Sequence, residues 1–127
     1  MKRLLVIVVA ILLIIGCISG CTYGSYIFIK SYETSGSNSW QISYEKFNGF
    51  KQRNIKLSDE DGLTFNVEIE TNSGVFGLVI VDSDGTSIYS GDDLPTSSFS
   101  VKADSAGKYT IRVNTDNHSG SFNITWE

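Results

Sequence analysis

The sequence predicts an all-β protein, an antiparallel β-sandwich of about 7–8 strands that follows an N-terminal hydrophobic signal helix. Two observations lead to this prediction. Beyond residue 21, apolar residues alternate with polar ones at period two, and no window shows the period of a helix. Gly, Asn, Asp and Ser interrupt this alternation at short intervals, as expected where short strands are joined by turns.

The first twenty residues have the composition of an export signal. Lys2 and Arg3 precede an uncharged apolar run, and residues 18–21 (ISGC) end it with small residues before a cysteine. This tetrad resembles the lipobox of prokaryotic lipoproteins, in which a thioether links the cysteine to a diacylglyceryl group. The resemblance implies a signal peptide over residues 1–20 and lipidation at Cys21.

Two alternatives to this N-terminus remain open. Residues 14–17 (IIGC) also resemble a lipobox, although the bulky Ile15 makes Cys17 the poorer candidate. The uncharged stretch from Leu4 to Ile29 is also long enough for an uncleaved transmembrane anchor. In each case the positive N-terminus stays inside, so the chain is expected on the extracytoplasmic face of the cell membrane.

Charge and cysteine content exclude several classes of function. The net charge is −4, and cleavage before Cys21 takes the basic residues from 10 to 8 against 14 acids, which leaves −6. Such a chain is a poor partner for nucleic acid, whose phosphates would repel it. Both cysteines lie in the signal region, so the folded part has no disulfide and no thiolate metal site. We therefore expect no cofactor.

The chain divides into three parts. Residues 1–20 are the predicted signal, residues 21–39 a lipid-anchored N-terminus and linker, and residues 40–127 the β-sandwich domain. Within the linker, Tyr26–Tyr32 is expected to form a short docked strand, and residues 34–39 (TSGSNS) a polar loop.

Strands of the domain are predicted from alternation, and turns from their residue types. The strands are expected at residues 40–47, 50–57, 63–70, 75–81, 86–90, 98–102, 108–114 and 122–126. Turns are expected at Asn48-Gly49, Ser58–Gly62, Asn72-Ser73-Gly74, Asp82–Gly85, Asp104–Gly107 and Asp116–Gly120. The predicted core between the two sheets comprises Phe65, Val67, Leu78, Ile80, Tyr109, Ile111 and Phe122.

Catalytic and metal chemistry have little support in the sequence. His118 is the one histidine and is expected in a solvated turn, whereas a Ser/His/Asp triad needs a buried, oriented histidine. The protein is therefore not expected to be an enzyme. Asp82 and Asp84 flank a serine before a glycine and are weak calcium candidates, because acids and glycine also favour turns for backbone reasons alone.

Acidic loops and one polar strand face are the candidate contact surfaces. Asp59, Asp61, Asp92 and Asp93 are weak binding candidates, since loops at the rim of a rigid sandwich often carry binding residues. The strand Leu63–Glu70 adds a row of outward polar residues: Thr64, Asn66, Glu68 and Glu70.

Three stretches resemble known exported domains. They are GLVIVDSDGTSIYS (77–90), FSVKADSAGKYTIRV (99–113) and GSFNITW (120–126). Together they resemble pre-peptidase C-terminal domains and, less closely, Golgi-dynamics domains, and residues 104–109 resemble the tyrosine corner of immunoglobulin-like sandwiches. The resemblance implies an accessory, non-catalytic role.

These observations lead to one functional hypothesis and one alternative. The hypothesis is a lipid-anchored cell-surface protein whose sandwich binds an unknown envelope protein or polymer. The alternative is a transmembrane-anchored sandwich with a structural role in the cell envelope.

Overall fold

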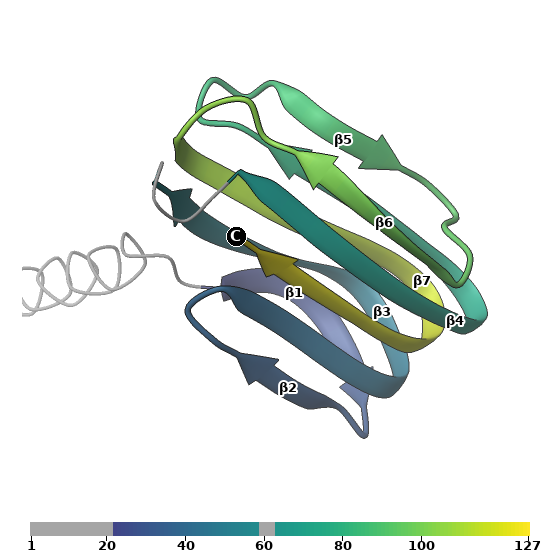
Figure 1. Ribbon diagram of the computed structural model, residues 1–127. Coiled ribbons are helices and arrows are strands. Elements are labelled where there is room, and N and C mark those ends of the chain that lie inside the picture. Colours follow the sequence, from purple (N-terminus) through teal and green to yellow (C-terminus); the bar gives the residue numbers. More distant parts are fainter. Residues whose placement is uncertain (1–21, 59–62) are drawn as a thin grey trace, which may run out of the picture.

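The computed structural model describes residues 22–58 and 63–127. They form seven antiparallel strands: β1 (Thr22–Ile29), β2 (Tyr32–Ser35), β3 (Ser39–Leu57), β4 (Thr64–Val81), β5 (Ser87–Gly91), β6 (Ser97–Lys102) and β7 (Gly107–Trp126) (Figure 1). None of these residues belongs to a helix that could cross a membrane. Cys17, Cys21, Asp59 and Asp61 lie outside the described residues, as does the signal segment.

Three strands are far longer than the sequence predicts, because three predicted turns are wrong. Asn48-Gly49 lies inside β3, Asn72-Ser73-Gly74 inside β4 and Asp116–Gly120 inside β7. The strand register shifts near the first two segments, between Tyr44 and Gly49 and between Thr71 and Val75. These bulges bend the strands, and they use the positive φ angles of Gly49, Gly74 and Asn117 that a turn would also need.

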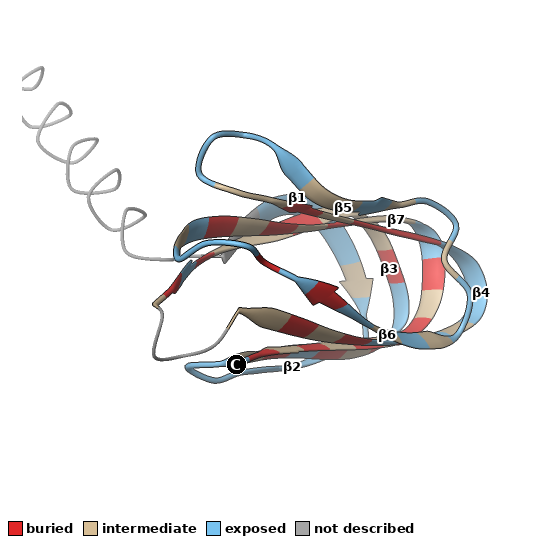
Figure 2. Cartoon of the chain, turned by 45° about the horizontal axis from the view of Figure 1, so that its top comes forward, coloured by how far each residue is buried: buried red, intermediate tan, exposed pale blue. Residues whose placement is uncertain are grey.

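The bent strands contribute to two stacked layers (Figure 2). In the first, here called the β2/β6 layer, the order is β2, the first half of β3, the second half of β7, the first half of β4, and β6. In the second, the β1/β5 layer, the order is β1, the second half of β3, the first half of β7, the second half of β4, and β5. The all-β antiparallel sandwich is thereby confirmed, with seven strands in the described part of the chain.

The segment before Trp40 takes part in the sheet. β1 pairs with β3 along its full length, from Thr22 opposite Arg53 to Ile29 opposite Lys46, and β2 pairs with β3 further along. In place of a single strand over Tyr26–Tyr32, the chain breaks at Lys30, whose φ is 49°. Residues that composition alone assigns to a linker thus form two edge strands.

The predicted core is confirmed. All seven residues expected between the sheets are buried, and with them Trp40, Phe47, Phe76 and Trp126. The tyrosine corner is also present, because the Tyr109 hydroxyl donates a hydrogen bond to the Ser105 carbonyl oxygen. Alternation therefore identifies the inward faces on both sides of each bend.

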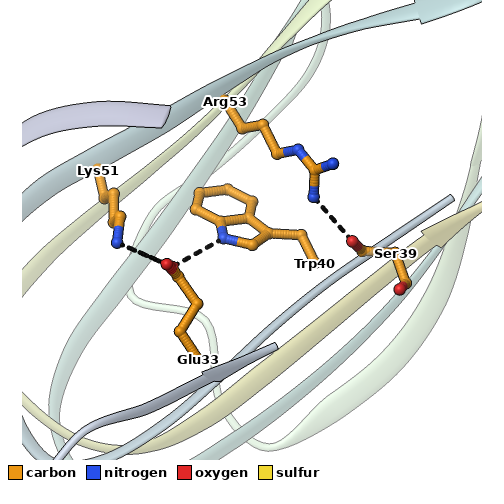
Figure 3. Close-up of polar contacts among 5 residues, drawn as sticks. All are labelled: Glu33, Ser39, Trp40, Lys51 and Arg53. Carbon is orange, nitrogen blue, oxygen red and sulfur yellow. Dashed lines mark hydrogen bonds and ion pairs between the residues drawn. The ribbon is translucent and has the colours of Figure 1, made fainter. Parts of the chain in front are cut away.

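Two cations of β3 join the layers along one edge (Figure 3). The Lys51 ammonium lies 2.8 and 3.0 Å from the two carboxylate oxygens of Glu33 on β2, and the indole of Trp40 donates to the same carboxylate at 3.2 Å. Arg53 donates to the carbonyl oxygens of Ser39, at 2.7 Å, and Gly36, at 2.8 Å. Each cation sits on an inward position of β3 and reaches the opposite layer.

Candidate functional site

The outer face of the β2/β6 layer is polar across all five strands. Residues directly opposite one another in neighbouring strands point to the same side of a sheet. One continuous row therefore crosses the layer: Thr34, Gln41, Asn123, Glu68 and Ser98. With strands about 4.8 Å apart, such a row spans roughly 19 Å.

Two further rows flank the first. One comprises Tyr32, Ser43, Ser121 and Glu70, and the other Ser39, Thr125, Asn66 and Ser100. Hydroxyl and amide groups predominate, and the carboxylates are confined to β4. The polar strand face predicted from the sequence is thus one column of a larger grid.

This face is hollowed. An open depression of about 600 Å³ lies over the middle of the layer and is bordered by the bend of β4 and the start of β6. Its lining comprises Gln41, Glu68, Ile69, Glu70, Asn72, Thr96, Ser97, Ser98, Ser121 and Asn123. Nine of these ten residues carry a side chain that can donate or accept hydrogen bonds, and Ile69 is the exception.

Most polar groups of the depression are available to a ligand. Within residues 22–58 and 63–127, the side chains of Glu68 and Glu70 form no hydrogen bond or ion pair, and both residues are exposed. At the β2 edge of the same face, Tyr32 is 73% exposed. The face thus combines free carboxylates and amides with one exposed aromatic ring.

A buried histidine supports one rim of the depression. The Tyr44 hydroxyl lies 2.6 Å from Nδ1 of His118, and the Thr71 hydroxyl lies 2.8 Å from its Nε2. The Thr71 hydroxyl also donates to the Leu94 carbonyl oxygen at 3.1 Å, while the backbone N–H of Thr71 donates to the Thr96 hydroxyl at 2.9 Å. This chain of hydrogen bonds joins β3, β7 and β4 at their bends and holds the loop 92–96.

These contacts determine the state of His118. Because the Thr71 hydroxyl donates to Leu94, it accepts from Nε2–H, which leaves Nδ1 to accept from the Tyr44 hydroxyl. The imidazole is therefore neutral, and burial lowers its pKa to about 4. Burial also raises the pKa of the Tyr44 hydroxyl well above its usual range. The expectation of a solvated turn histidine is wrong: His118 is fully buried, in the middle of β7.

Two of the acidic loops proposed from the sequence lie in the described part of the chain, at opposite ends of β5. Asp82 and Asp84 lie in the β4–β5 turn, near the first residues of β7, and one oxygen of Asp82 accepts from the N–H groups of Asp84, at 3.0 Å, and Thr86, at 2.9 Å. Asp92 and Asp93 lie at the opposite end, beside a smaller depression of about 310 Å³ on the β1/β5 layer. No group of three or more potential metal ligands occurs among the described residues.

Sequence reasoning missed the roles of His118 and Lys51. Both occupy inward positions of strands that the predicted turns interrupt. Lys51 has the same parity as Ile55 and Leu57 within the predicted strand 50–57, whereas His118 falls inside a predicted turn. The missed signal was a polar residue at a core position, which requires a buried partner.

Comparisons with known proteins identify no family. No family model matches the chain. No curated protein matches it either. The resemblance to pre-peptidase C-terminal domains therefore stays a prediction.

Some solved structures have a similar outline. A low-affinity xylan-binding module from Roseburia intestinalis has a TM-score of 0.44 and 9% identity, over 85% of this chain and 94% of that one. A periplasmic inhibitor of g-type lysozyme from Aeromonas hydrophila has a TM-score of 0.46 and 18% identity, over 74% of this chain and 90% of that one. A carbohydrate-binding module in complex with β-1,4-galactotriose has a TM-score of 0.44 and 11% identity, over 85% of this chain and 87% of that one. All three scores are below 0.5, so function has to be argued from the site itself.

Proposed function

We propose that this protein binds a glycan chain, without catalysis, on the outer face of the β2/β6 layer. The observation that carries the proposal is the row of hydroxyl, amide and carboxylate groups that crosses all five strands. Sugar hydroxyls both donate and accept hydrogen bonds, and amides and hydroxyls offer both functions as well. The free carboxylates of Glu68 and Glu70 add charge-assisted acceptors, which form the stronger hydrogen bonds.

The shape of the site favours a polymer over a small molecule. Sites for small ligands are usually concave, largely apolar pockets that bury most of the ligand. Here the depression is open and lined mostly by residues with polar side chains, and the rows continue beyond it towards β2. A chain of sugar units lying across the strands could use several rows at once, with weak contributions from each.

Tyr32 gives the face one aromatic platform. Its ring lies at the β2 edge, in the row that also holds Ser43 and Glu70. The apolar face of a sugar ring can pack against such a ring, and aromatic packing contributes about 0.5–1.5 kcal/mol beyond area burial. Tyr32 is therefore expected to fix one end of the bound chain.

The placement of His118 supports the proposed non-catalytic role. This residue is the one histidine of the chain, and it is buried between Tyr44 and Thr71, where no substrate reaches it. We further propose that Cys21 is lipidated and holds the domain on the extracytoplasmic face of the membrane, where envelope polymers are accessible. Mass spectrometry of the mature N-terminus tests this part separately, and an unprocessed Met1 would contradict it.

Two glutamines of β3 offer a matched test of the binding face. Gln41 lies on the outer face of the β2/β6 layer, and Gln52 on the outer face of the β1/β5 layer. The full-length protein, in detergent, is assayed by affinity electrophoresis and calorimetry against xylan, galactan, mixed-linkage β-glucan and soluble peptidoglycan fragments. Gln41→Ala combined with Asn123→Ala should weaken binding about tenfold, since each net hydrogen bond contributes about 0.5–1.5 kcal/mol.

Gln52→Ala is the control and should leave the affinity unchanged. Tyr32→Ala should weaken binding on its own by roughly two- to tenfold. Failure of every polymer to bind, or equal losses for the Gln41 and Gln52 variants, would overturn the proposal.

A further inference from the structure

Exposed apolar side chains concentrate at the first two strands. Five large hydrophobic residues are exposed in the described part of the chain, and four of them are Tyr26, Ile27, Ile29 and Tyr32. Tyr32 belongs to the polar face described above. Ile27 and Ile29, exposed by 64% and 46%, point outward from β1. These two adjacent outward isoleucines favour contact with a partner, because contiguous exposed apolar surface is typical of interaction sites.

β1 is also an unprotected edge. It pairs with β3 on one side, residue by residue and without a bulge, and no described strand pairs with its other side. Its sequence, TYGSYIFI, contains no charge and no proline. Edge strands are normally protected from further pairing by charges, prolines, bulges or short length.

The other edges of the sandwich carry these protections. β2 has four residues and contains Glu33, while β6 ends in Lys102. β5 has five residues, and its pairing with β4 is interrupted between Ile80 and Val81. Among the described strands, β1 is therefore the edge best suited to accept another strand.

β1 is held rigidly from beneath. The ring of Phe28 packs against Phe47 with centroids 4.4 Å apart, and Tyr26 packs against Phe28 at 4.8 Å. The buried ammonium of Lys51 lies 4.8 Å from the Tyr26 ring centroid. A strand that is already ordered loses little conformational entropy when it pairs, which favours association.

The backbone decides between a lipid surface and a protein partner. The free side of β1 presents unpaired N–H and C=O groups, which are very costly to bury in hydrocarbon. A second strand satisfies those groups and places its own outward side chains beside Ile27 and Ile29. Two acids near the strand do not oppose this approach, because Glu45 pairs with Lys30 at 3.3 Å and Glu33 with Lys51 at 2.8 Å.

We infer that β1 pairs antiparallel with β1 of a second copy of this chain. The contact is isologous, so each apolar residue contributes twice, and the two β1/β5 layers join into one continuous sheet. Confinement of both copies to one membrane raises their effective concentration, a point that rests on the proposed anchor. The polar face of the β2/β6 layer stays free in each copy, so the dimer presents two binding faces.

The test measures the mass of the full-length protein in excess detergent by sedimentation and light scattering. Wild type should be a dimer at high concentration, and Ile27→Lys should halve the mass. Val75→Lys is the matched control, because Val75 is also an exposed apolar residue, at 40%, on the outer face of the same layer but on β4. It should remain a dimer.

Circular dichroism checks that each variant is folded, and Ile29→Lys replaces Ile27→Lys if the latter does not fold. Hydrogen exchange should show β1 amides protected in wild type and released in the variant. A monomeric wild type, a dimer that survives Ile27→Lys, or equal loss in Val75→Lys would overturn the inference. Binding of polymer to a monomer would leave the proposed function intact.

Discussion

The two halves of β4 show how one strand can carry two different surfaces. Their inward residues are alike: Phe65, Val67 and Ile69 before the bend, and Phe76, Leu78 and Ile80 after it. Their outward residues differ: Thr64, Asn66, Glu68 and Glu70 before the bend, and Val75, Gly77, Val79 and Val81 after it. Both halves pack on the same core, so core packing does not account for the difference between their outward residues.

The same contrast extends from β4 to the edge strand β1, whereas β3 and β7 carry polar residues such as Gln52 and Arg112 on the outer face of the β1/β5 layer as well. On the β2/β6 layer the outer residues form rows of hydroxyl, amide and carboxylate groups. On the β1/β5 layer they include Ile27 and Ile29, and Arg112 lies 4.1 Å over the ring of Phe50. We propose a hydrated polymer as the partner of the first surface and a second copy of the chain as the partner of the β1 edge of the second.

The largest expected effect tests whether the layers share one core. Phe122 and Ile111 lie in different halves of β7, and both are buried. Phe122→Ala should lower the free energy of unfolding by about 3–5 kcal/mol, and Ile111→Ala by about 2–5 kcal/mol. Each variant should still unfold in a single urea transition. Asn123→Ala, on the outer face, should change stability by less than about 0.5 kcal/mol, and two separate transitions would mean that the layers are independent units.

A smaller effect tests the bends. Gly120 has a φ of 148°, and an added Cβ would lie 1.9 Å from the Glu70 carbonyl oxygen, so Gly120→Ala introduces both strain and a clash. Strain of about 1–2 kcal/mol and overpacking of about 1–3 kcal/mol should together destabilise the protein by roughly 2–5 kcal/mol. Gly85, with a φ of 82° and no atom near its Cβ position, is the control and should show the strain alone. Equal losses at the two sites would show that the bend is not tightly packed.

A still smaller effect concerns pH. The pKa of His118 is lowered to about 4 in the folded state, so the unfolded chain binds the proton first as pH falls. Stability should therefore decrease from about pH 6.5 to pH 4, by at most about 3 kcal/mol, and be fully present above pH 6.5. Urea unfolding at several pH values measures this slope. His118→Gln should remove the slope between pH 6.5 and 5, and an unchanged slope in the variant would assign the effect to other groups.

These comparisons also show what could be predicted from the sequence. Alternation identified the inward faces of all three long strands, because burial of Phe65 or Ile111 depends only on parity along the strand. It could not separate a bend from a turn at Asn48-Gly49 or Asn72-Ser73-Gly74, because both need the same positive φ angles. What keeps these strands continuous is pairing with β7, a contact between residues far apart in sequence.

The candidate site was likewise predicted only where a local pattern within one strand defines it. The column from Thr64 to Glu70 was visible as a polar face of one strand. Its neighbours Asn123 and Gln41 join it only through the register of β4, β7 and β3, which no local pattern encodes. Of the acidic loops, the carboxylate of Asp82 accepts hydrogen bonds from its own turn, and the binding role of Asp92 and Asp93 stays a prediction.

The most direct test of the account uses side-chain amides as reporters on both outer faces. Gln41, Asn66 and Asn123 lie on the β2/β6 layer, whereas Gln52, Asn54 and Asn114 lie on the β1/β5 layer. NMR spectra of the full-length protein in detergent are recorded during titration with xylan, galactan and β-glucan oligosaccharides. If the glycan binds the β2/β6 layer, the first three amides should shift with ligand concentration and the second three should not. Shifts confined to the second set, or spread equally over both, would contradict it.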